Sequence, residues 1–178
     1  MAKASEYAPL TERVWTCLCR LDAAYGRYAK TVDMNSASLR VLHVIYSRRR
    51  GDCTQSDIAG ETMLSKQTVN NIVKALVKDQ LVWIGESPRD GRMKTVKLTS
   101  KGLVRARTIF PPNEAARDGA FADLGNAEEA ERLAALLERY TAAYERAIAQ
   151  GPEAAAHPVK RPAPDPTISL SEMLGYTK

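Results

Sequence analysis

The stretch from Thr54 to Leu98 constrains the fold most, because two short helical patterns are followed there by two strand patterns. Thr54 and Asp57 have the spacing of a capping box, and Ser65 is placed to cap a second helix. The β-rich runs 81–84 and 95–98 are separated by a proline and an Asp-Gly pair, which favour turns. We therefore expect two helices with a short connection, followed by a two-stranded ribbon with a basic tip.

Two short helices followed by such a ribbon form a winged helix-turn-helix, which suits insertion of the second helix into the DNA major groove. Longer helical patterns lie on both sides of this lobe. Apolar residues recur at spacings of three and four from about Glu6 to Thr31, and a stripe from Leu133 to Ile148 follows a second capping box at Asn126. We expect the pair Pro111-Pro112 to end the helix that begins near residue 100, since neither proline can donate a backbone hydrogen bond.

These patterns predict a mainly α fold with a small antiparallel β wing, in which dimerisation helices flank a winged helix-turn-helix. The tail after Gly151 contains five of the nine prolines, a composition typical of an extended linker. A short helical turn that could dock on a partner is predicted near Ile168–Met173. The predicted domains are an N-terminal dimerisation helix (1–35), the DNA-binding lobe (36–104), C-terminal dimerisation helices (105–150) and the proline-rich tail (151–178).

The positive charge of the chain is concentrated in the same central lobe. Between Arg40 and Arg107 there are 14 basic and six acidic residues, a net charge of +8, whereas the rest of the chain carries −3. A local excess of this kind is typical of a polyanion-binding surface, although basic runs also occur on ordinary solvated faces. The central lobe is therefore the candidate surface for double-stranded DNA.

Specific residues within the lobe resemble the MarR family of bacterial transcriptional regulators. The resemblance runs over about residues 36–104 and rests on the runs Thr54–Ala59 and Ser65–Val69, the Asp90-Gly-Arg92 wing and the segment Val96–Gly102. It departs from the family pattern at Met63, where many relatives have a small or polar residue, and in the tail. The resemblance implies a dimeric DNA-binding regulator, more often a repressor than an activator.

Side-chain chemistry within the lobe suggests separate roles for its polar residues. Amides at the start of the second helix can pair with adenine, and a lysine there can reach guanine or phosphate. The predicted base contacts are Lys66, Gln67, Asn70 and Asn71. Residues at helix N-termini and nearby cations suit the phosphate backbone, namely Thr54, Gln55, Ser65, Thr68, Lys74 and Arg48 to Arg50. The resemblance assigns Arg92 to the minor groove, Asp90 to an ion pair that shapes the wing, and Arg89 and Lys94 to the backbone.

The signal that such a regulator would sense is open at the level of sequence. Trp15, Tyr25, Tyr28 and His43 are candidates for a ligand pocket, although aromatic residues at helical spacing are more often core. Cys17 is a candidate for oxidation, with burial as a small apolar residue as the alternative.

We expect a cytoplasmic protein, because neither a signal peptide nor an apolar run of the ~20 residues that span a bilayer occurs in the sequence. The cysteine and histidine spacings argue against a metal site, and no pattern indicates catalytic residues or a cofactor. The predicted function is that of a dimer that binds an inverted-repeat operator and is released by a small ligand. The alternatives are redox sensing through Cys17 and a winged-helix module that binds protein rather than DNA, with the tail recruiting a partner.

Overall fold

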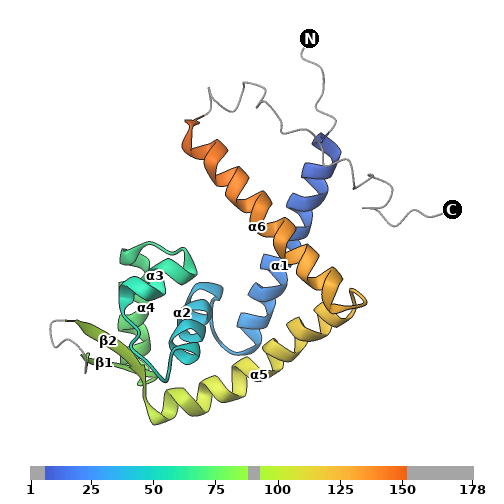
Figure 1. Ribbon diagram of the computed structural model, residues 1–178. Helices are drawn as coiled ribbons and strands as arrows, with labels where there is room; N and C mark the ends of the chain where they lie inside the picture. The colour runs from blue at the N-terminus through green and yellow to red at the C-terminus, as the bar shows by residue number, and fades with distance from the viewer. Residues whose placement is uncertain (1–6, 88–92, 152–178) are drawn as a thin grey trace. The chain divides into compact units, whose positions relative to one another are not determined.

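The computed structural model of the chain describes residues 7–87 and 93–151 (Figure 1). The chain divides into two compact units, of which the first ends at Arg117 and the second begins at Asp118. Within the described residues, the first unit holds helices α1 (Ala8–Thr31), α2 (Ser36–Ser47), α3 (Gln55–Thr62) and α4 (Lys66–Lys78), strands β1 (Val82–Glu86) and β2 (Lys94–Leu98), and most of α5 (Ser100–Ala122). The second unit holds α6 (Ala127–Ala149). The predicted mainly α fold with a small antiparallel β wing is confirmed.

Side-chain caps mark the starts of α2, α3, α4 and α6, whereas α1 has none. Asn35 accepts a hydrogen bond from the Ser38 backbone N–H at the start of α2, and Asn126 accepts one from Glu129 N–H at the start of α6. Thr54 forms a complete capping box with Asp57 at the start of α3. Such caps satisfy backbone donors that lack an intrahelical partner and contribute about 1 kcal/mol each.

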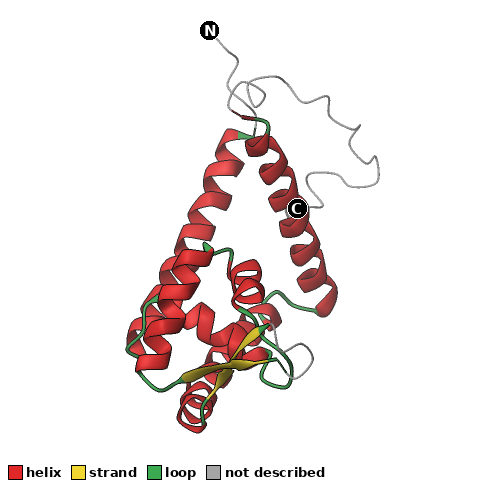
Figure 2. Ribbon diagram, turned by 90° about the vertical axis from the view of Figure 1, so that its left-hand side faces the viewer, coloured by secondary structure: helices red, strands yellow, loops and turns green. Residues whose placement is uncertain are grey.

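The core of the first unit forms between α2, α4, the wing and the first half of α5. Helix α2 is buried around most of its circumference, with Leu39, Leu42 and Ile45 in the core. Strands β1 and β2 pair in the register Val82↔Leu98 to Glu86↔Lys94, so that Val82 and Val96 face the core while Trp83 lies on the outer side (strands in yellow, Figure 2). The fully buried apolar side chains include Leu39, Val41, Leu42, Ile45, Ile58, Val69, Val73, Ile109 and Phe110.

The expectation that Pro111-Pro112 ends its helix is wrong, since α5 continues through both prolines to Ala122. The φ angle that a proline ring imposes is itself a helical value, so the cost lies in two missing N–H donors and crowding of the preceding turn. Ile109 and Phe110, directly before the prolines, are buried in the core and hold this turn in place. The hydroxyl of Tyr28 on α1 also donates a hydrogen bond to the Ile109 carbonyl.

Among the described residues, no helix is both long enough and apolar enough to cross a membrane. The predicted docking turn in the tail lies outside the described residues.

Candidate nucleic-acid interface

Helix α4 presents a polar N-terminal turn above a buried apolar face. Its N-cap, Ser65, accepts a hydrogen bond from the Thr68 backbone N–H at 3.1 Å, as the sequence predicts, and the two hydroxyl oxygens are 2.8 Å apart. Val69 and Val73 lie fully in the core. Because that face is fixed against α2 and the wing, the first turns of α4 expose Lys66, Gln67 and Asn71, while Asn70 is half-buried.

Two of the predicted base contacts are already joined to each other. The Gln67 Nε2 donates a hydrogen bond to the Asn71 Oδ1 at 3.2 Å, one turn further along α4. This bond restricts both side chains and leaves Gln67 with one N–H and its carbonyl oxygen, and Asn71 with its NH₂ group. Gln67 therefore keeps the adjacent donor and acceptor that pairing with an adenine edge requires.

The start of helix α3 is held by a capping box and by a β-bridge to the wing. The backbone N–H and the hydroxyl of Thr54 each donate to Asp57 Oδ2, both at 2.8 Å. The backbone N–H of Thr54, its hydroxyl and Arg48 hold the pKa of the Asp57 carboxyl below its usual value. Thr54 also forms a β-bridge with Thr95 of β2, which joins the start of α3 to the wing.

A tight turn connects α3 to α4. Met63 adopts the left-handed conformation, with φ 56° and ψ 20°, and its side chain is 85% exposed. Thr62 Oγ1, which is buried, donates to the Ile58 carbonyl at 2.6 Å and so closes the last turn of α3. Met63 thus occupies a backbone position that glycine or asparagine would adopt at lower cost.

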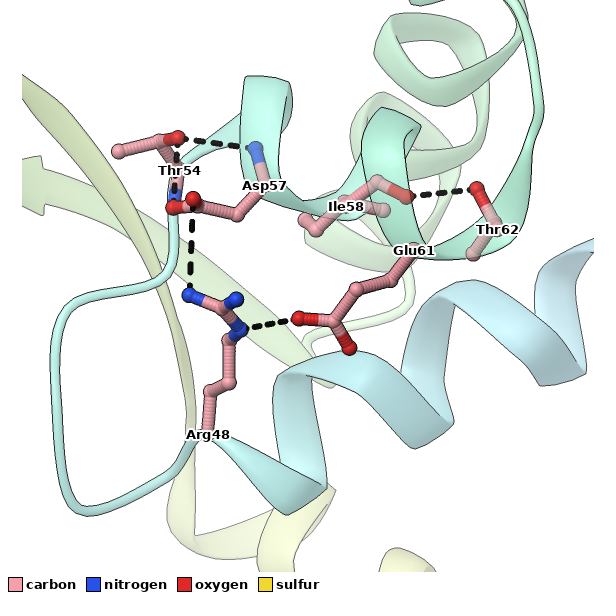
Figure 3. Close-up of polar contacts among 6 residues, drawn as sticks. All are labelled: Arg48, Thr54, Asp57, Ile58, Glu61 and Thr62. Atoms are coloured by element: carbon pink, nitrogen blue, oxygen red, sulfur yellow. Dashed lines mark hydrogen bonds and ion pairs between the residues drawn. The ribbon is translucent and has the colours of Figure 1, made fainter.

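Two of the three arginines expected to add charge for phosphate have partners within the protein. The Arg48 guanidinium, just beyond the end of α2, forms ion pairs with Asp57 and Glu61 of α3 (Figure 3). Arg49 donates to the Tyr46 carbonyl at 2.8 Å and lies 4.3 Å from the centroid of the Tyr46 ring. The link from Arg48 to α3 was not predicted from the sequence, although the four-residue spacing of Asp57 and Glu61 marks two acids on one helix face.

The remaining predicted backbone contacts lie on both sides of α4. Lys74 is exposed on the helix, Gln55 is half-buried in the first turn of α3, and Lys94 is exposed at the start of β2, opposite Glu86. The predicted wing residues Arg89, Asp90 and Arg92 lie outside the described residues. On the outer face of the wing, the Trp83 indole covers Gly85, where a Cβ atom would lie 2.0 Å from the ring.

The residues predicted to sense a signal differ in their exposure and contacts. Trp15 is 54% exposed on α1, whereas Tyr25 and Tyr28 pack partly against the core and the Tyr28 hydroxyl is used by the Ile109 carbonyl. The His43 ring packs 4.8 Å from the Phe110 ring, with Nε2 3.6 Å from Glu114 Oε1. A hollow of about 980 Å³ lies elsewhere, between the end of α1, the start of α2, the end of α4 and the start of α5, and is lined by Met34, Leu76, Val104 and Arg105 among others.

The three cysteines have different environments. Cys17 and Cys19 are exposed on α1, so burial of Cys17 as a packing residue is not its state in the single chain. Cys53 is buried beside the start of α3, and burial raises its pKa to about 11. A thiol with so high a pKa is a poor nucleophile at neutral pH, which leaves the two cysteines of α1 as the accessible ones.

Two helices joined by a tight turn and followed by paired strands define a winged helix-turn-helix, a class of DNA-binding module. Residues 32–93, which hold most of this winged-helix lobe, match the model of the MarR family. Proteins of this family are DNA-binding transcription factors and not enzymes.

The chain is also similar to two curated transcriptional regulators. The chain is 30% identical over 90 residues to the HTH-type transcriptional repressor IacR of Pseudomonas putida, a match that covers 47% of this chain and 53% of that protein. It is 27% identical over 106 residues to the HTH-type transcriptional regulator MhqR of Bacillus subtilis, covering 60% and 71% respectively. The match therefore spans only about half the length of IacR.

Solved structures share the fold over a longer part of the chain. NMB1585, a MarR family regulator from Neisseria meningitidis, has a TM-score of 0.66 at 24% identity and covers 82% of this chain and 98% of its own. The MepR–DNA complex of Staphylococcus aureus gives 0.67 at 17% identity, covering 79% and 99%. BpsR of Bordetella bronchiseptica, whose DNA binding is regulated by 6-hydroxynicotinic acid, gives 0.61 at 20% identity, covering 79% and 98%.

Proposed function

We propose that this chain is a transcriptional repressor that binds an inverted-repeat operator as a homodimer, with α4 in the major groove. The observation that carries the proposal is the first turn of α4, where exposed amide and ammonium groups stand above an apolar face fixed in the core. The excess of positive charge in residues 40–107 supports it, because DNA affinity arises largely from neutralised phosphates. Two similar proteins support the proposal as well: IacR is named a transcriptional repressor, and the structure of MepR contains DNA.

In this proposal the polar residues divide into reading and positioning groups. Lys66, Gln67, Asn70 and Asn71 contact base edges, and the hydrogen bond between Gln67 and Asn71 presents one amide in a fixed orientation. The backbone contacts come from both helix starts, α4 and the wing, namely Thr54, Gln55, Ser65, Thr68, Lys74, Arg89 and Lys94. Asp90 holds the wing and Arg92 enters the minor groove.

The test begins with selection of genomic DNA fragments that the purified protein retains. In mobility-shift titrations on a retained fragment, Gln67→Ala relaxes the preference at one position per half-site by about 1–3 kcal/mol, and Arg92→Ala weakens binding. The control is Gln150→Ala, the same truncation at the end of α6. Unchanged affinity and preference in both test variants would contradict the assigned roles.

Salt dependence separates this function from that of a protein-binding module. A dimer that neutralises several phosphates loses affinity steeply as salt rises, with a slope of about −0.9 per phosphate in a plot of log K against log [salt]. A retained partner that is protein, and a complex that is insensitive to added DNA, would instead support the module.

A small ligand is the signal we propose for release of the DNA, and BpsR gives a precedent among the proteins of this fold. The hollow bordered by Val104 and Arg105 has the volume and the mixed polar and apolar lining that such a ligand requires. Small aromatic acids are the probes, scored by release of the bound operator. A compound that releases the wild type but not Val104→Trp, in which a larger side chain occupies the hollow, supports this site.

Oxidation is a second candidate signal because Cys17 is exposed. Mild peroxide treatment followed by mass measurement tests it: a mass increase on Cys17 with loss of operator binding, both absent in Cys17→Ser, supports this signal. Full binding by the oxidised protein excludes it.

A further inference from the structure

Arg48 joins the end of α2 to two acids on α3. It is the residue directly after α2, and its side chain extends across to the neighbouring helix (Figure 3). Its Nε donates a hydrogen bond to Glu61 Oε1, and its Nη1 lies 3.5 Å from Asp57 Oδ1. Asp57 and Glu61 are four residues apart and so share one face of α3. A single planar group therefore spans one turn of α3 from a fixed point on α2.

The two oxygens of the Asp57 carboxylate have separate partners. Oδ2 accepts from the backbone N–H and the hydroxyl of Thr54, which completes the cap of α3. Oδ1 faces Arg48. The guanidinium is thus connected, through one carboxylate, to the N-terminal cap whose residues Thr54 and Gln55 approach the phosphate backbone in the proposed function. The planar guanidinium of arginine can donate to two carboxylates at once, whereas a lysine ammonium acts as a single point charge.

The charges of this group also differ from those of a phosphate contact. Arg48, Asp57 and Glu61 together carry −1, and the hydrogen bond to Glu61 raises the pKa of the Arg48 guanidinium above its ordinary value. The cation is therefore shared by two carboxylates within the most basic part of the chain. Without it, the carboxylates of Asp57, in the first turn of α3, and of Glu61, near the end of α3, would both lack this cation.

We propose that Arg48 is a positioning residue, which holds α3 against α2 and neutralises Asp57 and Glu61, and does not contact DNA phosphate. This inference rests on the proposed function for its effect on DNA, whereas the positioning of α3 can be measured without DNA. It predicts the opposite of what charge alone would give. Glu61→Gln removes a negative charge from the DNA-binding lobe, which by itself would strengthen operator binding, and yet operator binding becomes weaker.

The experiment compares Glu61→Gln, Arg48→Lys and the control Arg50→Gln on operator DNA and on an unrelated duplex. Glu61→Gln and Arg48→Lys each weaken operator binding about 2- to 5-fold, the range expected for an exposed ion pair, and leave the salt slope unchanged. Neither test variant removes a positive charge; Arg50→Gln, which does, gives the comparison for a phosphate contact and should lower both the affinity and the salt slope. The double variant Arg48→Lys/Glu61→Gln is no weaker than either single variant, because both disrupt the same contact.

Tighter operator binding by Glu61→Gln, together with normal binding by Arg48→Lys, would overturn the proposal and make Arg48 a phosphate contact. Hydrogen exchange of the α3 amides, measured without DNA, is the second readout: it becomes faster in Glu61→Gln and Arg48→Lys if Arg48 holds α3. Unchanged exchange in both variants also overturns the proposal. If the wild type binds no DNA, the proposed function fails, while the exchange data still decide whether Arg48 positions α3.

Discussion

Gly102 lies where the first turn of α5 crosses the backbone at Leu81. A Cβ atom at this position would be 1.8 Å from the Leu81 carbonyl oxygen, a distance that no side-chain rotation can relieve. The backbone N–H of Gly102 also donates to Thr99 Oγ1 at 2.9 Å, which fixes the start of the helix. The close approach of α5 to the base of the wing therefore depends on the absence of a side chain here.

We expect Gly102→Ala to lower the free energy of unfolding by about 3 kcal/mol, because α5 must move away from the strand it packs on. Urea unfolding followed by circular dichroism measures the change. The matched control is Gly119→Ala, also in α5, where a Cβ meets nothing within 4 Å. That change should stabilise the helix by about 0.5–1 kcal/mol, so the same substitution gives opposite signs at two positions of one helix. A Gly102→Ala variant as stable as the wild type would contradict the close approach.

At the scale of the element, His43 connects α2 to the part of α5 beyond the prolines. Burial, followed by the charge of Arg117, lowers the His43 pKa, and these effects outweigh the nearby Glu114 carboxylate, which raises it. A histidine whose pKa is lower in the folded protein binds fewer protons there than in the unfolded chain near and below pH 6.5. The His43 contribution to stability is therefore present at pH 7.5 and is lost as the pH falls.

Urea unfolding at pH 7.5 and pH 5.5 tests this contact. The free energy of unfolding of the wild type should fall between the two values, and that of His43→Gln should fall less. Glu114→Gln removes an interaction that favours the protonated ring and should make the decrease steeper than in the wild type. Equal decreases in the wild type and in His43→Gln would exclude His43 as the titrating group.

The elements of the first unit show which parts of a fold are encoded locally. The caps at Thr54 and Ser65 were predictable, because the residues that make them are three apart in the chain. The continuation of α5 through Pro111-Pro112 was not, because it depends on burial of Ile109 and Phe110 against segments far away in the sequence. The same reason applies to the candidate site. The exposure of the polar residues of α4 can be predicted from their position in the helix. The ion pairs of Arg48 join two helices, and no pattern within one helix shows which residues they connect.

At the scale of the whole molecule, each compact unit has a helix whose apolar side chains remain exposed. Within α6 no residue is buried, and the predicted stripe of apolar side chains is exposed along its length. The stripe consists of Leu133, Leu136, Leu137, Tyr140, Tyr144 and Ile148. Helix α1 likewise exposes Leu10, Trp15, Leu18 and Leu21. An exposed apolar stripe along a helix is typical of an interface, and the proposed dimer gives each stripe a partner in a second copy of the chain.

Leu137→Glu tests the dimer, with Ala135→Glu as a control that places the same charge on the opposite side of α6. Burial of a leucine contributes about 1.5–3 kcal/mol, and a two-fold dimer contains the change twice, so the dimer dissociation constant should rise by about two orders of magnitude or more. Light scattering at micromolar concentration should then detect a monomer for Leu137→Glu and a dimer for Ala135→Glu. Operator affinity should fall with the loss of the second lobe, while unfolding of the first unit stays unchanged. A dimeric Leu137→Glu protein would assign the interface to a different face, and a monomeric wild type would contradict the dimer itself.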